Sequence, residues 1–226
     1  MSRLTLIVGN KNYSSWSLRG YLAVKASGLD FHEIVIPLRN NDTHQRIKAH
    51  SPSGLVPAIV DGDILVWETL AICEYLAELA PGAGLWPEDR AARAHARSIS
   101  AEMHAGFATL RRNLPMDITH DRHEESRAHL AKEDIARVTS IWHEARTRFG
   151  EKGSHGAGPF LYGGFSAADA MYAPVATRFR TYGVPLDPVS AAYCEAIFAW
   201  PAFKEWEAAA LTETAVIAFD VFQKAD

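Results

Sequence analysis

The stretch of sequence that decides the fold is GLVPAIVDGDILVWET, residues 54–69. It holds two β-prone runs, 56–60 and 64–67, joined by a turn at Asp61-Gly62-Asp63. An Asp-Gly turn between two such runs is a strong hairpin signal. Pro57 stands at the start of the first run, where a proline removes a ladder donor. We therefore expect an antiparallel hairpin that begins with a cis Val56-Pro57 bond in a tight turn. A trans proline on an edge strand is the alternative.

Strand and helix patterns alternate upstream of this hairpin. Residues 4–8 (LTLIV) and 31–37 are short apolar runs typical of strands, and the apolar spacing over 17–26 predicts a helix between them. The polar stretch 39–48 predicts a loop with a short irregular helix, and a helix over 68–79 follows the hairpin. Strands joined by a crossover helix lie parallel. The pattern therefore predicts a small mixed sheet with helices packed on it.

A Pro/Gly-rich segment, APGAGLWP at 80–87, is the best domain boundary in the chain. Only helical patterns follow it, at 89–114, 122–149, 166–182, 188–198 and 201–211, with a glycine-rich connection at 150–164 that contains Gly153. FSAAD at 165–169 is a capping-box pattern, in which Ser166 and Asp169 satisfy each other's backbone N–H groups. The sequence thus predicts an α/β domain over 1–80 and an all-α domain over 88–226.

Composition excludes several classes of protein. The chain has 226 residues and a formal net charge of −4, so it gains nothing from counterion release and nucleic acid is not an expected partner. No apolar run reaches the ~18 residues of a membrane helix, and the start of the sequence does not read as a secretory signal. We expect a cytoplasmic protein with two buried free thiols, Cys73 and Cys194, and no metal site, because no Cys/His cluster has ligand spacing.

The segment NKNYSSWSLR, residues 10–19, lies between the first strand and the first helix. Its serines and asparagines are good helix caps, which is the structural interpretation. The functional interpretation uses the same geometry, because a helix N-terminus has unpaired N–H groups and favours negative charge. A hydroxyl there can donate a hydrogen bond to an anion such as a thiolate.

Two further segments suit a peptide ligand. With a cis Pro57, the backbone of Val56 faces outward and can pair with an extended peptide. Glu68 and Thr69 begin the third helix, where capping is the structural interpretation. The functional interpretation is that Thr69 and the free N–H groups hold a carboxylate.

The order of these three motifs resembles the cytosolic glutathione transferase superfamily, over essentially the whole chain. YSSWSLR at 13–19 looks most like the serine-type zeta class (maleylacetoacetate isomerase-like), whose first helix follows a Ser-Ser-Cys-Ser motif. The resemblance implies a thioredoxin-like N-terminal domain with a mixed four-stranded sheet, an all-helical C-terminal domain and a homodimer.

The resemblance also implies site residues. It assigns the thiol-activating serine to Ser14, with Ser15 as the competitor, and makes glutathione the co-substrate. It assigns glutathione binding to Val56, Pro57, Glu68 and Thr69. The electrophile would contact residues of the cleft: Tyr13, Trp16, His104, Phe107 and Arg111.

The chain departs from the zeta pattern at three places, one of which is the fourth helix, where residues 102–112 replace the zeta Gln/Asn motif. Trp16 occupies the position of the zeta cysteine, and Gly54-Leu55 stand where the family often has a Lys, His or Gln that contacts glutathione. The cation for the glycine carboxylate must then lie elsewhere, and the candidates are Lys48, His44 and Arg46. In EMHAGFATLRR, residues 102–112, the side chains of His104, Phe107 and Arg111 are spaced to share one helix face.

The expected function is transfer of glutathione to a small electrophile, as in detoxification. The first alternative is a glutathione-dependent cis-trans isomerase of a maleyl-type diacid, with Arg19, Arg111 or Arg112 binding the acid groups. The second is a non-enzymatic binding protein that uses the same fold.

Overall fold

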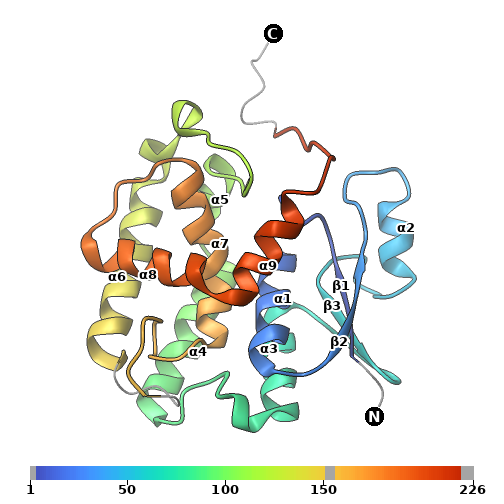
Figure 1. The fold of residues 1–226 in the computed structure, drawn as a ribbon, viewed down its shortest axis with the longest axis horizontal. Coiled ribbons are helices and arrows are strands. Elements are labelled where there is room, and N and C mark those ends of the chain that lie inside the picture. The colour runs from blue at the N-terminus through green and yellow to red at the C-terminus, as the bar shows by residue number, and fades with distance from the viewer. Residues whose placement is uncertain (1–3, 151–155, 220–226) are drawn as a thin grey trace.

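The computed structural model describes residues 4–150 and 156–219, and Figure 1 shows its arrangement. Its strands and helices are β1 (Leu4–Val8), α1 (Ser15–Ser27), β2 (Phe31–Val35), α2 (Thr43–Lys48), β3 (Ala58–Asp61), β4 (Ile64–Trp67), α3 (Thr69–Leu79), α4 (Arg90–Ala105), α5 (Ala108–Asn113), α6 (Lys132–Phe149), α7 (Ala167–Thr181), α8 (Pro188–Ala199) and α9 (Pro201–Ala210). The described residues after β4 contain no further strand, so this part of the chain is helical.

The four strands form one mixed sheet in the order β2-β1-β3-β4. β1 is parallel to β2 and antiparallel to β3, and β3 and β4 form the predicted hairpin. Alternation along β1 buries both faces, because Leu6 packs with the main core and Ile7 packs with Ile47 of α2. The predicted mixed sheet is confirmed, and so is the short helix in the polar stretch.

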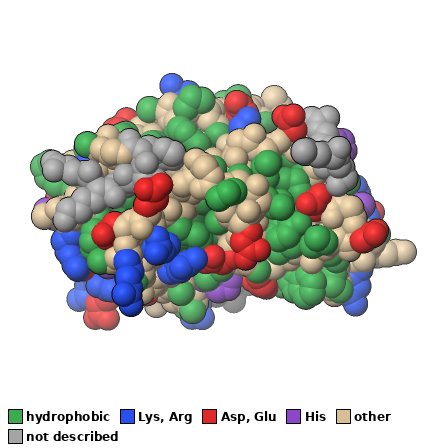
Figure 2. Space-filling view, turned by 90° about the horizontal axis from the view of Figure 1, so that it is seen from below, with side chains coloured by type: hydrophobic (Ala, Val, Ile, Leu, Met, Phe, Trp, Pro, Cys, Tyr) green, Lys and Arg blue, Asp and Glu red, His purple; other side chains and the backbone are tan. Residues whose placement is uncertain are grey.

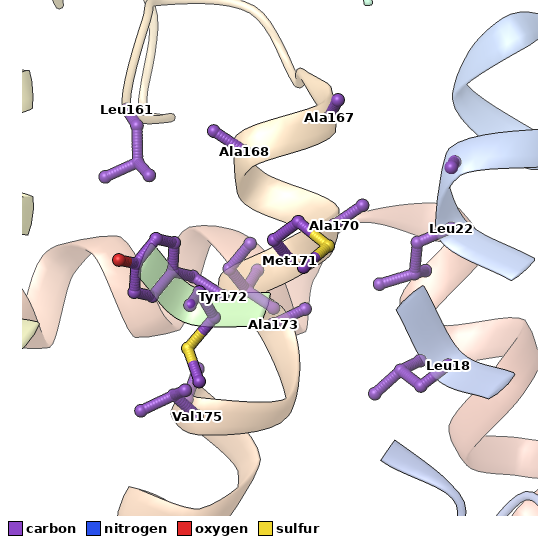
Figure 3. Close-up of a cluster of buried hydrophobic side chains, with 14 of the residues drawn as sticks. Leu18, Leu22, Leu161, Ala167, Ala168, Ala170, Met171, Tyr172, Ala173 and Val175 are labelled. Atoms are coloured by element: carbon purple, nitrogen blue, oxygen red, sulfur yellow. The ribbon is translucent and has the colours of Figure 1, made fainter. Parts of the chain in front are cut away.

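Helices α1 and α3 lie between the sheet and the helical part, whereas α2 covers the opposite face of the sheet (Figure 1). The contact between α1 and α7 joins the two parts (Figure 3). Leu18 and Leu22 of α1 are fully buried, and the facing turn of α7 contributes small side chains such as Ala170 and Ala173. Small residues let the two helix backbones approach closely, so the apolar core continues from one part into the other.

The predicted capping box at the start of α7 is confirmed. Asp169 is fully buried, and its carboxylate accepts hydrogen bonds from the Ser166 N–H at 2.8 Å, the Ser166 hydroxyl at 2.7 Å and the Leu161 N–H at 3.1 Å. Burial raises the pKa of Asp169 to about 6, although these hydrogen bonds oppose the rise. The most buried helix of the protein therefore begins at an acidic group that the fold shields completely from water.

One expected helix, 89–114, is wrong, because the structure breaks it into α4 and α5. Gly106 leaves the helix in an extended conformation, and Phe107 follows in the left-handed region with φ 59°. This turn places the Phe107 ring in the core at 8% exposure. Burial of an aromatic ring contributes about 1.5–3 kcal/mol, which offsets the unfavourable backbone conformation.

The expected helix over 122–149 is also too long. Residues 123–125 and 128–131 form two short 3-10 turns, and the α-helix begins only at Lys132. At the start of this segment, the Arg122 guanidinium donates to the buried Asp117 and to Glu125. In the glycine-rich connection, Gly153 lies outside the described residues, and Phe160 and Gly163 form an isolated bridge.

The two cysteines are buried free thiols, as predicted. Burial raises the pKa of both Cys73 and Cys194 to about 12, so neither is a nucleophile at neutral pH. In the part of the chain that the structure describes, no helix is long and apolar enough to cross a bilayer. The same residues include no group of three or more His, Cys, Asp or Glu side chains arranged to hold a metal ion.

Asp169→Ala should destabilise the protein by about 3 kcal/mol at pH 7, because it leaves three buried donors without an acceptor. The loss should grow toward pH 5. The folded pKa of about 6 lies above the ordinary value of 3.8, so the wild-type protein gains stability as pH falls between these values, and the variant does not. Urea unfolding of both proteins at pH 5 and pH 7 measures the difference.

Asp187→Ala is the control, because the Asp187 carboxylate also accepts backbone hydrogen bonds at a helix start, as the exposed N-cap of α8. It should cost about 1 kcal/mol. Equal losses for the two variants would contradict the role given to the buried cap.

Candidate active site

A pocket of about 240 Å³ lies where the start of α1, the loop before β3 and the start of α3 meet. It is lined by Trp16, Ser53, Leu55, Val56, Pro57, Glu68 and Thr69. The structure thus brings together all four residues that the sequence assigned to peptide binding, together with Trp16. These residues come from three segments, and only the folded sheet makes them neighbours.

The Val56-Pro57 peptide bond is cis, as predicted. Pro57 packs directly on α1 at Gly20, where a Cβ would come within 2.8 Å of the proline ring. Val56 precedes Ala58, the first residue that pairs in β3, so its N–H and C=O lie outside the sheet ladder. Backbone groups beside a pocket and outside a ladder are available to an extended ligand.

Glu68 and Thr69 form the second side of the pocket. Glu68 adopts a left-handed φ of 70°, which turns the chain abruptly from β4 into α3. Thr69 is 1% exposed, and its hydroxyl has no hydrogen-bond partner among the described residues. A buried unpaired hydroxyl at a helix N-terminus, where the N–H groups are also free, is suited to a carboxylate.

Ser14 and Ser15 stand at the N-terminus of α1, outside the lining of this pocket. Ser14 is the N-cap, and its hydroxyl accepts from the Ser17 N–H at 3.3 Å and donates to the Ser17 hydroxyl at 2.8 Å. Ser15 is half-buried, and its hydroxyl makes no hydrogen bond within the described part of the chain. The capping interpretation of Ser14 is therefore confirmed, whereas the Ser15 hydroxyl is uncommitted.

Trp16 lies beneath a cluster of cationic and aromatic groups. The guanidinium of Arg19 lies 4.5 Å from its ring centre and that of Arg111 lies 5.0 Å away. The His104 ring meets Trp16 edge-on at 5.1 Å and lies 3.6 Å from the Glu68 carboxylate. His104 and Arg111 therefore converge on Trp16 even though the helix that was expected to carry both is broken.

The expectation that His104, Phe107 and Arg111 share the face of one helix is wrong, because the chain leaves the helix at Gly106 and Phe107 is a buried core residue at the turn between α4 and α5. The break at Gly106 explains both facts, because it turns Phe107 inward while Arg111 folds back to the carbonyl groups of Met103 and His104. Tyr13 lies on another side, where its ring contacts Phe219 edge-on at 5.7 Å.

Two arginines of this region, Arg19 and Arg178, are buried and form no ion pair within the part of the chain that the structure describes. Burial, and then the charge of Arg178, lowers the pKa of Arg19 well below its usual value. Burial lowers that of Arg178 to about 10. Carbonyl oxygens accept from both side chains, since the Arg19 Nε donates to Met171 at 2.8 Å and the Arg178 Nε to Leu114 at 2.8 Å, while the buried Nη2 of Arg19 has no partner among the described residues. Backbone oxygens carry no net charge, so the positive charge persists near the start of α1.

The candidate cations for a second carboxylate lie on α2 and are exposed. His44 packs against Gly54, where a Cβ would come within 2.5 Å of the imidazole, so it stands beside the pocket loop. Lys48 and Arg46 are on the same short helix, and none of the three lines the pocket.

Sequence reasoning missed Ser53, whose hydroxyl accepts from the Leu55 N–H at 3.1 Å and shares a hydrogen bond with Ser51 at 2.9 Å. The signal was the Ser-Pro-Ser-Gly turn at 51–54, which is rich in residues that fold back on their own backbone.

Comparison with known proteins gives a family match, three relatives by sequence and two similar solved structures. Residues 13–79 match the family described as the N-terminal domain of glutathione S-transferase. A probable maleylacetoacetate isomerase from Caenorhabditis elegans is 37% identical over 97 residues, which are 42% of this chain and 44% of that protein. Glutathione S-transferase Z1 from Arabidopsis thaliana is 35% identical over 112 residues, 45% of this chain and 51% of that protein. The chain thus spans about half the length of these relatives.

A stringent starvation protein A homolog from Coxiella burnetii is 28% identical over 207 residues, 90% of each chain. Among solved structures, a bacterial zeta-class maleyl pyruvate isomerase has a TM-score of 0.70 at 22% identity and covers 93% of this chain and 100% of its own. A glutathione transferase homologue from Burkholderia with bound glutathione has a TM-score of 0.68 at 24% identity and covers 94% and 100%. These structures confirm the predicted fold class.

Thr69→Val should leave the free energy of unfolding unchanged within about 0.5 kcal/mol, because it replaces a hydroxyl that has no partner by a methyl group of similar size. Ser14→Ala, by contrast, should cost about 1 kcal/mol through loss of the N-cap. Urea unfolding measures both. A larger loss for Thr69→Val than for Ser14→Ala would mean that the Thr69 hydroxyl supports the fold rather than a ligand.

Proposed function

We propose that this protein binds glutathione and activates its thiol for attack on a small electrophile, because residues 13–79 match the N-terminal domain of glutathione S-transferase and the chain has the glutathione transferase fold. The observation that carries the proposal is the pocket where the Val56 backbone, cis Pro57 and the unpartnered Thr69 hydroxyl meet beside the start of α1.

The pocket suits glutathione in three places. The free backbone of Val56 pairs with the cysteinyl unit in the manner of a strand. The Thr69 hydroxyl and the first N–H groups of α3 hold the γ-glutamyl carboxylate, and Glu68 faces the ammonium group beside it. His44, next to Gly54, is the best placed of the α2 cations for the glycine carboxylate.

Thiol activation needs no general base. A free thiol has a pKa near ~8.5, and lowering it by two units requires about 2.7 kcal/mol of preference for the anion. A hydrogen bond to a charged group contributes about 1.5–3 kcal/mol. A helix N-terminus adds about 0.3–1 kcal/mol. One serine hydroxyl at the start of α1 is therefore sufficient, and it acts as a donor rather than as a covalent nucleophile.

The two serines compete for this role. Similarity to the zeta motif favours Ser14. Hydrogen bonding favours Ser15, because the Ser14 hydroxyl must leave Ser17 before it can donate to a thiolate. Both are retained as catalytic candidates, and substitution distinguishes them.

Ser14→Ala should raise the pKa of the bound glutathione thiol by about one to two units, the equivalent of one charged hydrogen bond. Turnover at neutral pH should fall about ten- to a hundredfold and recover partly as pH rises, because high pH supplies the thiolate directly. Ser15→Ala should have the smaller effect. The measurements are pH–rate profiles with a chloronitrobenzene and titration of the thiolate absorbance.

A reversed order of the two variants would move the role to Ser15. If both variants keep wild-type turnover, the N–H groups of α1 alone activate the thiol, and the serine mechanism is rejected.

Glutathione-dependent isomerisation of a diacid is the second candidate, and the arginines over Trp16 favour it. Arg19 and Arg111 form no ion pair within the described residues and lie within 5.0 Å of the ring centre. Turnover of maleylpyruvate alongside the chloronitrobenzene separates the two reactions. Glutathione binding without either reaction would leave the non-enzymatic alternative.

We also propose that the protein is a cytoplasmic homodimer. Each chain would consist of two domains, about 1–80 and 88–226. Strand β4 is an edge of the sheet and leaves Ile64 52% and Trp67 41% exposed. Figure 2 shows hydrophobic side chains gathered over the middle and right of the face seen from below. Exposed apolar surface of this kind favours a symmetric contact between two copies.

Sedimentation should accordingly give a species of twice the 24.9 kDa chain mass at micromolar concentration. Trp67→Glu should shift it toward the monomer, because it places a charge in the apolar contact. A wild-type protein that sediments as a monomer would reject the dimer.

A further inference from the structure

The loop that leads into α1, residues 9–14, has no regular secondary structure, yet the helical part holds its backbone at several points. The Trp206 indole N–H of α9 donates to the Lys11 carbonyl at 2.8 Å. This lead-in loop ends at the serines of the proposed mechanism. Its position therefore determines where their hydroxyls stand.

Glu213, three residues beyond α9, makes the most specific of these contacts. Its two carboxylate oxygens accept from the backbone N–H groups of Lys11 at 2.7 Å and Asn12 at 3.1 Å. Within the described residues these two N–H groups have no other acceptor. A carboxylate bound by two backbone donors is a strong, geometrically specific contact.

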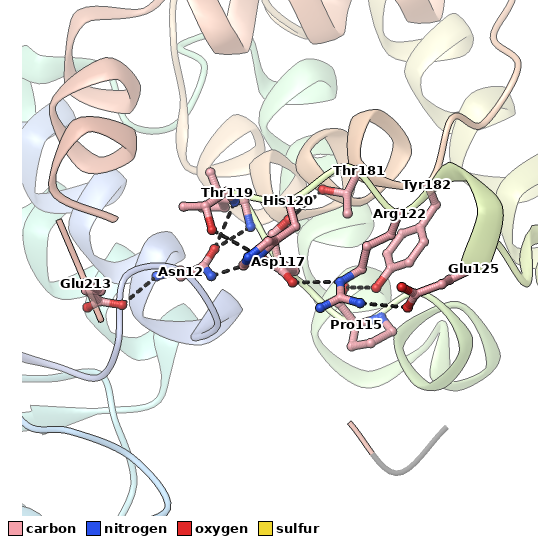
Figure 4. A network of polar contacts seen from close by, with 11 residues as sticks. Asn12, Pro115, Asp117, Thr119, His120, Arg122, Glu125, Thr181, Tyr182 and Glu213 are labelled. Carbon is pink, nitrogen blue, oxygen red and sulfur yellow. Dashed lines mark hydrogen bonds and ion pairs between the residues drawn. The ribbon is translucent and has the colours of Figure 1, made fainter. Parts of the chain in front are cut away.

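Asn12 fixes the other side of the loop (Figure 4). Its side-chain oxygen accepts from the N–H groups of Ile118 at 2.6 Å and Thr119 at 3.0 Å, and its amide donates to Asp117 at 3.0 Å. Burial alone would raise the pKa of Asp117, but hydrogen bonds from His120, Arg122 and Asn12 outweigh burial and hold it below the usual value. This anchor is charged, buried and independent of Glu213.

Asn12 and Glu213 hold different parts of the lead-in loop. The Asn12 side chain attaches the loop to residues 117–119, and Glu213 fixes the backbone direction of the two residues before Tyr13. The Phe219 ring covers Tyr13, so the tail beyond Glu213 continues along the same loop. Removal of the Glu213 carboxylate leaves two partly buried N–H groups without an acceptor just ahead of Ser14.

We propose that Glu213 is a positioning residue, which holds the lead-in loop so that the serine hydroxyl at the start of α1 meets the glutathione thiol. The inference rests on the proposed function and deepens it, because it assigns part of the thiol activation to the segment after the last helix. Glu213 acts through the loop and touches neither the pocket nor the ligand.

Glu213→Ala should raise the pKa of the bound thiol by about 0.5–1 unit, because a displaced hydroxyl makes a weaker hydrogen bond to the thiolate. Turnover at neutral pH should fall about three- to tenfold and recover at high pH. The KM for glutathione should change less than about twofold, because Val56 and Thr69 are untouched. The thiol pKa and the turnover of Glu213→Gln should lie between those of Glu213→Ala and the wild type, because the amide oxygen still accepts from one N–H.

Glu205→Ala is the matched control. Glu205 of α9 also joins the helical part to α1, through Lys25 at 2.6 Å and the Tyr21 hydroxyl at 3.1 Å, but it makes no hydrogen bond to the backbone of the lead-in loop among the described residues. It should leave the thiol pKa and the pH–rate profile unchanged.

Amide hydrogen exchange of residues 10–15 separates this inference from the proposed function, since it needs no ligand. Faster exchange in Glu213→Ala, together with a raised thiol pKa, supports the positioning role. Where the wild-type protein binds glutathione, an unchanged thiol pKa in Glu213→Ala, or an equal effect of Glu205→Ala, overturns it. If the wild-type protein binds no glutathione, the proposed function fails. Unchanged hydrogen exchange of residues 10–15 in Glu213→Ala would then also reject the role of Glu213 in holding the loop.

Discussion

Helix α1 belongs to both parts of the molecule, and its burial is the constraint on which the rest of the structure depends. It packs against the sheet, α3, α7 and α9, and Leu18 and Leu22 are fully buried. A helix covered on so many sides can present only its ends to ligands. Its N-terminus, with free N–H groups and a partial positive charge, therefore becomes the natural place for an anion, and the pocket beside cis Pro57 lies there.

The same burial explains the unusual charges of this region. Arg19 lies on the covered face of α1 and Arg178 lies on α7. Among the described residues their guanidinium groups donate to carbonyl oxygens rather than to acids, and the buried Nη2 of Arg19 has no partner. Burying a guanidinium is costly unless its donors are paired, and pairing with neutral groups leaves the charge uncompensated. The start of α1 is thereby surrounded by positive charge. This favours an anionic thiolate and anionic substrates over neutral ones, which is why the transferase and isomerase proposals share one site.

Rigidity at the site comes from outside the sheet. The lead-in loop has no regular secondary structure to hold it. Distant residues hold it by hydrogen bonds: the Glu213 carboxylate accepts from the loop backbone, and the Asn12 side chain bonds to residues 117–119. A small displacement of a catalytic group can be worth a large factor in rate. In the proposed mechanism, the helical part therefore helps to position a hydroxyl that belongs to the thioredoxin-like part.

The sequence by itself determined the features that depend on neighbours in the chain. The hairpin at 56–67, the Ser166–Asp169 capping box and the cis Val56-Pro57 bond are confirmed because turn, cap and proline preferences act over a few residues. The local sequence pattern also predicted that Glu68 and Thr69 begin α3.

The local pattern failed at Gly106-Phe107, where burial of the Phe107 ring in the distant core outweighed helical periodicity. Only the tertiary structure decided that His104 and Arg111 meet on Trp16 and that Glu213 reaches the loop at Lys11. These contacts join residues far apart in sequence, and no local preference encodes which of them packing brings together.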